Sequence, residues 1–357
     1  MNIIFEPVKS FLKLYKIDSS TKSEEKIELK PTMEEIISER LRKIGKVEAL
    51  GYILYHGGEL IRESISLLTS ENISKVEECI KFSPEYNELT FNIASYGLSH
   101  FTSIPHILFC DTAFFFNLPE EANTYAVPYQ LREQYIRRYG GYGICHQWTW
   151  KQVQSFYQES TSRILSIYLG NFTNITALKN GRPVETTIGF TPIEGMPSST
   201  SCGDIDPTII EQLYSTGLSF PEIKQLLTRE SGFTGLSGKK TELLDILKRI
   251  DHPEYFAVYD IYRYNILKHI GAFISILGGV DTIVFVGKNV KKFKGLIFEI
   301  CERLKFLGLK YKKNPNSIAK LLDITARKSS IKVFCLEYDK AEILRNEIVD
   351  FLNRMGG

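Results

Sequence analysis

The stretch that decides the fold is ILSIYLGNFTNITALKNGRPVETTI, residues 164–188. Its apolar and β-branched runs predict three strands: Ile164–Leu169, Ile175–Leu178 and Val184–Ile188. The turns between them contain Gly170-Asn171 and Asn180-Gly181, pairs that permit a tight change of chain direction. The stretch therefore predicts a strand-turn-strand repeat.

The beginning of the chain has the same pattern. Asn2–Phe5 and Phe11–Ile17 are β-prone runs, and we expect a turn at Glu6–Ser10 between them. A strand-turn-strand unit near the start of each half indicates a duplicated nucleotide-binding lobe, so the predicted fold class is α/β with two lobes and mixed sheets.

Other patterns place the remaining elements. A capping box at Thr32 and Glu35 predicts a helix that ends at Gly45. Further strands are expected at Val47–Tyr55, Ile104–Cys110, Thr282–Val286 and Lys332–Leu336, and helices at Pro221–Leu227, Leu243–Ile250, Tyr255–Leu277 and Asp339–Met355. Asp111 follows the strand Ile104–Cys110 directly, and α/β sheets place ligand-facing residues at such strand ends, so Asp111 is a site candidate.

The composition narrows the function classes. The 44 Lys and Arg residues nearly balance 42 Asp and Glu residues, and a formal charge of +2 gives no reason to expect nucleic acid or an anionic membrane as partner. The six cysteines form no CxxC pair. Residues 1–18 do not resemble a signal peptide, and the longest apolar run, Ile270–Val280, is too short to span a bilayer. We expect a cytoplasmic protein with reduced thiols.

Several blocks, in order, resemble segments of the acetate kinase family, whose members transfer phosphate between ATP and acetate. They are YHGGEL (55–60), CDTAF (110–114), YAVPYQLREQYIRRYG (125–140), YLGNFTNITALKNGRPVETTIGFTPIEG (168–195), CGDIDP (202–207), ESGFTGLSG (230–238) and IGAFISILGGVDTIVFVG (270–287). The chain thus resembles a divergent member of this family, which includes acetate and butyrate kinases and belongs to the actin-like ATPase superfamily.

The resemblance implies a duplicated ribonuclease H-like fold of the actin and sugar-kinase type. Residues 1–112 with 341–357 would form the N-terminal lobe and 113–340 the C-terminal lobe, with the active-site cleft between them. It also implies ATP and Mg²⁺ as cofactors, a small carboxylate as substrate and a homodimer.

The catalytic positions are partly changed. Asp111 matches the family's catalytic aspartate, but Tyr142 stands where the family has a histidine that steadies the transition state. Ser201 and Ile53 replace the two arginines of the family's site, the second of which holds the carboxylate or phosphate. Positive charge around the transferring oxygens is what phosphoryl transfer requires most, so these two losses argue against ordinary activity.

The nucleotide and metal positions are changed as well. The residues that fall at nucleotide-binding positions of the family are Lys13, Tyr168, Leu169, Gly170, Asn171, Glu242 and Gly287, which we interpret as vestigial. Glu6 and Lys340 fall at the family's metal-ligand positions, and a lysine there would repel Mg²⁺. The family's first phosphate loop, NSGSSSLK, is EPVKSFLK here, in which Pro7 removes a backbone N–H.

The hypothesis is therefore an acetate kinase-like pseudoenzyme with a binding, regulatory or assembly role. One alternative is an active ATP-dependent kinase for acetate or a short acyl group, with Lys9 and Lys288 supplying relocated positive charge. Another is a sensor that binds a small apolar molecule, since Phe115 and Phe116 stand where the family is polar.

Overall fold

The computed structural model describes residues 1–8, 11–18, 21–28, 46–156, 162–313, 317–318 and 321–356. The predicted helix from Thr32 to Gly45 lies outside these residues. Contacts divide the chain into two compact units, which are described separately. The first comprises Met1–Phe116, Gly141–Ile144 and Asp339–Gly357, and the second comprises Asn117–Gly140 and Cys145–Tyr338.

The first unit is built on a mixed sheet with the strand order β3-β2-β1-β4-β6-β5. Its strands are β1 (Asn2–Val8), β2 (Phe11–Ile17), β3 (Lys22–Glu28), β4 (Ala49–Leu54), β5 (Ile65–Leu68) and β6 (His106–Cys110). The strands β1, β2 and β3 are antiparallel neighbours, whereas β4 is parallel to both β1 and β6. The four strands that we predicted in this part of the chain are confirmed, with small shifts of their ends.

The expected turn at Glu6–Ser10 is wrong for its first residues. β1 continues to Val8, and Glu6 lies opposite Lys13 in the ladder with β2. Pro7 is compatible with this strand because the pairing of β1 with β4 ends at Phe5, so no neighbour on that side requires the N–H that proline lacks. Glu6 is consequently a buried strand residue rather than a loop residue.

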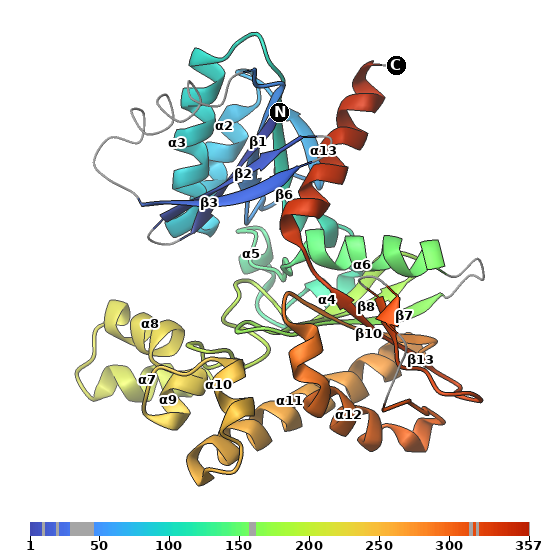
Figure 1. The fold of residues 1–357 in the computed structure, drawn as a ribbon. Helices are drawn as coiled ribbons and strands as arrows, with labels where there is room; N and C mark the ends of the chain where they lie inside the picture. The colour runs from blue at the N-terminus through green and yellow to red at the C-terminus, as the bar shows by residue number, and fades with distance from the viewer. Residues whose placement is uncertain are drawn as a thin grey trace. The chain divides into compact units, whose positions relative to one another are not determined.

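Helices cover both faces of this sheet (Figure 1). They are α2 (Ile73–Glu78), the short 3₁₀ helices η1 (Cys79–Phe82) and η2 (Thr112–Phe115), α3 (Pro84–His100) and α13 (Lys340–Gly356). Figure 1 shows α2 and α3 on one side of the sheet and α13 on the other. Ile93 and Ala94 of α3 join a buried core with Ile3 and Phe5 of β1.

The second unit has a sheet with the order β11-β12-β13-β10-β7-β8-β9. Its strands are β7 (Arg163–Tyr168), β8 (Asn174–Lys179), β9 (Arg182–Thr186), β10 (Thr282–Gly287), β11 (Ser317–Ile318), β12 (Leu321–Asp323) and β13 (Lys332–Glu337). The three strands of the stretch 164–188 are confirmed as an antiparallel meander, since β7 pairs with β8 and β8 with β9.

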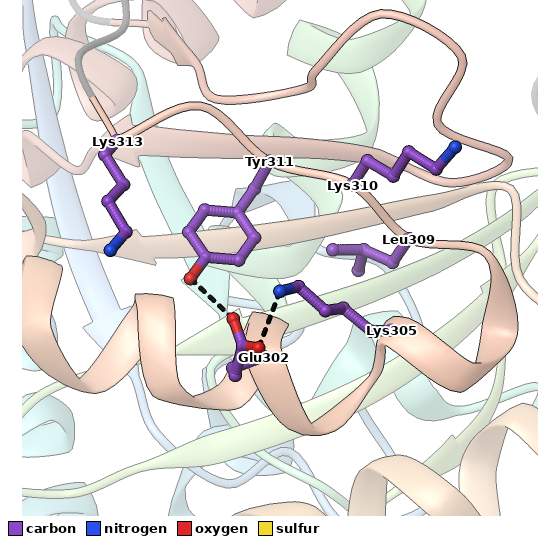
Figure 2. A pocket seen from close by; sticks show the side chains of 6 residues that line it. All are labelled: Glu302, Lys305, Leu309, Lys310, Tyr311 and Lys313. Carbon is purple, nitrogen blue, oxygen red and sulfur yellow. Dashed lines mark hydrogen bonds and ion pairs between the residues drawn. The ribbon is translucent and has the colours of Figure 1, made fainter.

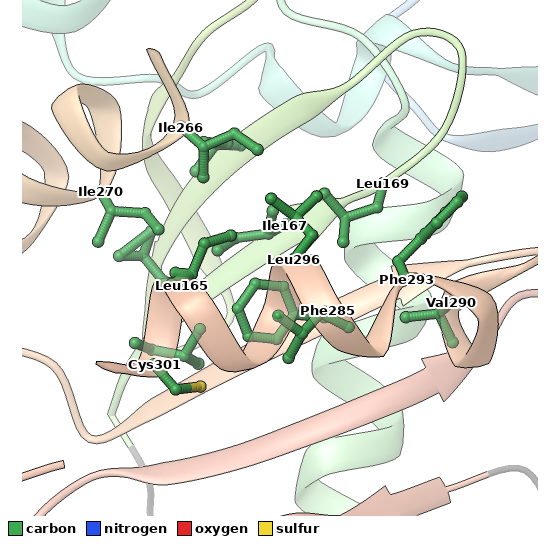
Figure 3. Close-up of a cluster of buried hydrophobic side chains, with 14 of the residues drawn as sticks. Leu165, Ile167, Leu169, Ile266, Ile270, Phe285, Val290, Phe293, Leu296 and Cys301 are labelled. Atoms are coloured by element: carbon green, nitrogen blue, oxygen red, sulfur yellow. The ribbon is translucent and has the colours of Figure 1, made fainter. Parts of the chain in front are cut away.

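The helices of the second unit are α4 (Glu120–Asn123), α5 (Tyr129–Arg132), α6 (Gly143–Phe156, in this unit from Cys145), α7 (Thr208–Ser215), α8 (Phe220–Arg229), α9 (Gly232–Ser237), α10 (Leu243–Lys248), α11 (Pro253–Leu277), η3 (Val290–Phe293), α12 (Lys294–Arg303) and η4 (Lys305–Leu307). Ile270 of α11 and Leu296 of α12 pack with Leu165, Ile167 and Phe285 of the sheet in one buried cluster (Figure 3).

The two sheets repeat one topology. In each, three antiparallel strands follow in chain order, and the first of them is parallel to a neighbour that is parallel to a further strand. The predicted duplicated α/β fold is thereby confirmed. No helix within the described ranges is long and apolar enough to cross a membrane.

Candidate functional site

The pleat of the first sheet brings polar residues to one face. Glu6 lies opposite Lys13 and Ile4 lies opposite Tyr15 in the β1–β2 ladder, so these four side chains share a face. Phe5 and its partner Tyr52 in β4 point to the opposite face. The alternation along β1 and β2 thus gathers a carboxylate, a phenol and an amine in a small area.

Glu6 is the centre of this group. Its Oε1 accepts hydrogen bonds from the Tyr55 hydroxyl at 2.7 Å and from the Lys340 ammonium group at 2.5 Å. Its Oε2 accepts a hydrogen bond from the Tyr15 hydroxyl and lies 3.8 Å from Nζ of Lys13. These four groups on the carboxylate oxygens are all donors or cations, and Glu6 itself is buried.

The ionisation of Glu6 follows from this environment. Burial by itself raises the pKa of the carboxyl, but the charges of Lys340 and Lys13 and the hydrogen bonds from Lys340 and Tyr15 outweigh it and lower the pKa to about 2. The same carboxylate, together with burial, raises the pKa of the Tyr55 phenol well above its ordinary value. The site therefore holds an anionic Glu6 between protonated donors at neutral pH.

Asp111 has a different set of partners. It follows β6 directly, and its two carboxylate oxygens accept the backbone N–H groups of Tyr142, at 2.7 Å, and Ile144, at 3.2 Å. Burial raises the pKa of Asp111, while the Lys340 charge and these two N–H groups oppose the rise. Tyr142 has a left-handed backbone with φ of 59°, a strained conformation that this bond to Asp111 helps to fix.

Ile53, which the resemblance places at a family arginine, belongs to the core. It lies in β4 opposite Phe109 and has no exposed surface. Because side chains alternate along β4, Ile53 lies on the face opposite to that of Tyr52, which is the face that carries Glu6. An apolar side chain thus fills this position next to the polar group.

Four residues that the resemblance places at nucleotide-binding positions lie at two neighbouring strand ends in the second unit. The backbone N–H of Leu169 donates to Val286 of β10, and a Cβ added at Gly287 would lie 2.4 Å from the Leu169 carbonyl oxygen. Tyr168 ends β7 and its ring packs edge-on against Tyr338. The structure therefore brings Tyr168, Leu169 and Gly287 together, with Gly170 directly after them.

Asn171 and Glu242 are neighbours of the same region. The Asn171 side-chain oxygen accepts the N–H of Leu243 at 3.3 Å, and its carbonyl accepts the N–H of Ser199 at 2.8 Å. Glu242 precedes α10, and its own N–H donates to Asp245 at 3.1 Å, as in a helix cap. Both residues thus have partners that stabilise the local backbone.

Ser201 lies in a tight turn of the second unit. Its hydroxyl contacts that of Ser198 at 2.8 Å, and its N–H donates to the same Ser198 oxygen at 3.0 Å. Its side chain is buried. Ser201 therefore closes a turn, and among the described residues its hydroxyl has a neutral partner, Ser198.

Tyr15 and Tyr55 are site residues that sequence reasoning did not identify. They are separated by 40 positions, and nothing in either local sequence distinguishes them from the 19 tyrosines of the chain. The signal available was the alternation itself, because a residue two positions beyond the partner of Glu6 must lie on the same face.

The residues that the resemblance places at the family's metal positions do not fit Mg²⁺. That ion prefers oxygen ligands with free lone pairs, supplied by carboxylates, carbonyls and water. Lys340 has an ammonium group and no lone pair, and the Glu6 oxygens already receive two phenols and an ammonium group. Nor do three His, Cys, Asp or Glu side chains gather into a metal cluster anywhere in the described residues.

The strand order and the duplicated sheets define an α/β protein with a duplicated, actin-like fold. The chain belongs to the acetokinase family, whose pattern matches residues 13–345. It is 32% identical over 324 residues to acetate kinase 2 of Clostridium perfringens, covering 88% of this chain and 80% of that one. It is 33% identical over 307 residues to acetate kinase of Sulfurimonas denitrificans, covering 84% and 77%.

Solved structures agree. The crystal structure of Porphyromonas gingivalis acetate kinase superimposes with a TM-score of 0.89 at 25% identity, over 98% of this chain and 99% of that one. Acetate kinase from Entamoeba histolytica has the same fold, with a TM-score of 0.88 at 21% identity over 97% and 98%. The predicted family and fold are confirmed, whereas the roles of the individual site residues stay predictions.

Proposed function

We propose that this chain is an acetokinase-family protein in which acetate phosphorylation is lost or very slow, and that it acts by binding, in regulation or assembly. The ion pair between Glu6 and Lys340 carries this proposal. At the two positions where the resemblance places the family's metal ligands, this chain has a buried carboxylate and the lysine that neutralises it. The Lys340 ammonium group thus supplies the positive charge next to Glu6 that a metal ion would otherwise supply.

The arginine positions support the same conclusion. Ile53 is buried in a strand and Ser201 closes a turn, so neither position offers a cation to a phosphoryl group. One transition-state arginine is worth roughly 10³ to 10⁵ in rate, and kinases turn over at about 1 to 100 per second. Two such losses, if they act independently, would leave about 10⁻⁴ per second or less.

A turnover measurement tests this proposal directly. Purified protein with ATP, acetate and Mg²⁺ should form acetyl phosphate at or below about 10⁻⁴ per second, with Asp111→Ala unchanged from that background. A rate in the range of ordinary kinases that disappears in Asp111→Ala would instead establish an active carboxylate kinase. In that case Lys288, which directly follows β10, and Lys9, which lies outside the described residues, become the cations to replace by glutamine.

A double substitution tests the ion pair itself. Glu6→Asn with Lys340→Glu restores the residue types of the family's segments at both positions. Mg²⁺ should raise the melting temperature of this double variant. In the original protein, Mg²⁺ should have no more effect on the melting temperature than a monovalent salt at the same ionic strength. Equal responses to Mg²⁺ in both proteins would contradict the proposed replacement of the metal by Lys340.

Ligand screening separates the kinds of binding role. A melting-temperature increase with ATP and no turnover supports a nucleotide-binding regulator. An increase with short acyl compounds alone supports a sensor for apolar ligands. The expected homodimer belongs to the proposal too, and light scattering on the eluted protein should give about twice the 40.9 kDa chain mass.

A further inference from the structure

A second polar region lies in the second unit, where α12 ends and η4 begins. The segment from Gly308 to Lys313 follows η4 and is held by the turn 326–330. The Lys310 N–H donates to the Ser329 hydroxyl at 2.8 Å, and the Ser330 N–H donates to the Gly308 carbonyl at 3.1 Å. Two stretches that are not consecutive in sequence thus form one surface.

This surface is strongly basic. Between residues 302 and 313 Glu302 is the one acidic residue, whereas the basic residues are Arg303, Lys305, Lys310, Lys312 and Lys313. The turn 326–330 adds Arg327 and Lys328 and contains no acid. In a chain whose total formal charge is +2, this is a local concentration of positive charge. The sequence alone indicates a solvated loop here, because it does not show that the segments converge.

The basic segment surrounds a pocket with a volume of about 780 Å³. Its lining consists of Glu302, Lys305, Leu309, Lys310, Tyr311 and Lys313. Figure 2 shows the amines of Lys305 and Lys313 on either side of the Tyr311 hydroxyl, while Lys310 points away from it. A pocket of this size is large enough for a small organic ligand.

Two contacts hold the floor of the pocket in place. Glu302 accepts a hydrogen bond from Lys305 at 2.6 Å and one from the Tyr311 hydroxyl at 2.9 Å. The Tyr311 ring stacks on Phe298, with ring centres 5.2 Å apart and an interplanar angle of 22°. Lys305 and Tyr311 therefore have defined positions before any ligand arrives, which lowers the entropic cost of binding.

The charges of the lining do not cancel. The lining carries three lysines and one glutamate, which leaves a net charge of +2. Within the part of the chain that the structure describes, no carboxylate lies within ion-pair distance of Lys310 or Lys313. Lysine amines in a concave site attract phosphate groups as compact positive charges.

We propose that this pocket binds a small molecule carrying two or more linked phosphate groups, held between Lys305 and Lys313 with Lys310 at the rim. The site is independent of the proposed function, because its residues belong to neither the metal nor the nucleotide positions of the family. Its volume of about 780 Å³ matches a compact polyanion rather than an extended one such as nucleic acid.

Calorimetric titration with inorganic triphosphate, without Mg²⁺ and at low salt, tests this proposal. We expect one bound triphosphate per chain, with inorganic phosphate binding more weakly. Lys305→Gln and Lys313→Gln should each weaken binding about 5-fold, in line with about 1 kcal/mol for an exposed charge pair. Glu302→Gln should strengthen binding, since it removes the one negative charge of the lining.

Lys224→Gln is the matched control, because Lys224 is an exposed lysine of α8 and loses the same charge. It should leave the affinity unchanged. Triphosphate affinity that persists in the Lys305→Gln, Lys313→Gln double variant would place binding elsewhere and overturn the proposal. Tighter binding of duplex DNA than of triphosphate, lost in the same double variant, would overturn it in favour of a nucleic-acid surface.

Discussion

The ammonium nitrogen of Lys340 lies 2.5 Å from Oε1 of Glu6, although 334 positions separate the two residues. This contact joins the first strand of the chain to its last helix, and a second one reinforces it, because Lys22 of β3 pairs with Asp339 and Glu342 at the start of α13. Since Glu6 is buried, the two ends of the sequence depend on each other electrostatically.

Removing one partner of the Glu6–Lys340 pair should destabilise the protein more than removing both. Lys340→Met leaves a buried carboxylate without its closest cation, which costs about 3 to 5 kcal/mol. Adding Glu6→Gln should recover most of the loss. Urea unfolding measures both values, and equal destabilisation by the single and double variants would contradict this coupling.

Glu6 should also make stability depend on pH in the acid range. Its pKa in the folded protein is about 2, below the ordinary 4.5, so its contribution is fully present above pH 4.5 and is lost as the pH falls towards 2. Glu6→Gln removes this dependence. We expect the difference in unfolding free energy between the two proteins to shrink over this window, and a difference that stays constant would contradict the assignment.

Asp111 should matter for stability even where turnover is absent. Asp111→Ala leaves the N–H groups of Tyr142 and Ile144 without their acceptor, at about 1 to 3 kcal/mol for an unsatisfied buried group. Asp111→Asn keeps one acceptor oxygen and should cost less. Thermal unfolding of both variants checks this order. An Asp111→Ala protein as stable as the original would leave the carboxylate without the structural role described here.

The fold was predictable because its strands carry their own apolar signal. Phe11–Ile17 and Thr282–Val286 were recognisable from β-branched and aromatic residues at the correct spacing, and the structure has strands there. β3 was not recognisable. Its sequence, KSEEKIE, buries only Ile27, since it is an edge strand whose stability comes from backbone pairing with β2.

The site was predictable only where the family's pattern reaches. Glu6 and Lys340 were assigned to one group by resemblance, and the structure shows them in contact. Proline at position 7 suggested a turn and concealed the fact that Glu6 lies inside a strand. Tyr15 and Tyr55 come from different strands, so their convergence on one carboxylate depends on register and pleat, which a single sequence does not specify.

Gly287 and Gly170 form a matched pair for substitution by alanine. A Cβ at Gly287 would lie 2.4 Å from the backbone oxygen of Leu169, which cannot move without disturbing β7. At Gly170 the nearest atom is 3.2 Å away and belongs to the Tyr168 ring. Gly287→Ala should therefore cost about 1 to 3 kcal/mol in urea unfolding and Gly170→Ala clearly less. Equal costs would contradict the close approach of β7 and β10.

His146 of α6 should add a second pH dependence to the stability of the protein. Its imidazole lies between the Ser166 hydroxyl, 2.7 Å from Nδ1, and the Asn174 side-chain oxygen, 2.5 Å from Nε2. Burial lowers the pKa of His146 to about 4, although the bond to Asn174 opposes the shift. The folded protein thus keeps this ring neutral where the unfolded chain takes up a proton.

The sign follows from this difference. The unfolded chain binds more protons between the ordinary pKa of 6.5 and about 4, so stability is fully present above pH 6.5 and falls as the pH decreases to about 4. A shift of this size corresponds to roughly 3 kcal/mol. Burial also lowers the pKa values of His106 and His269, so the informative quantity is the difference between the original protein and His146→Gln. That difference should change across pH 4 to 6.5, and urea unfolding curves that stay parallel over this range would show that His146 is not the group that titrates.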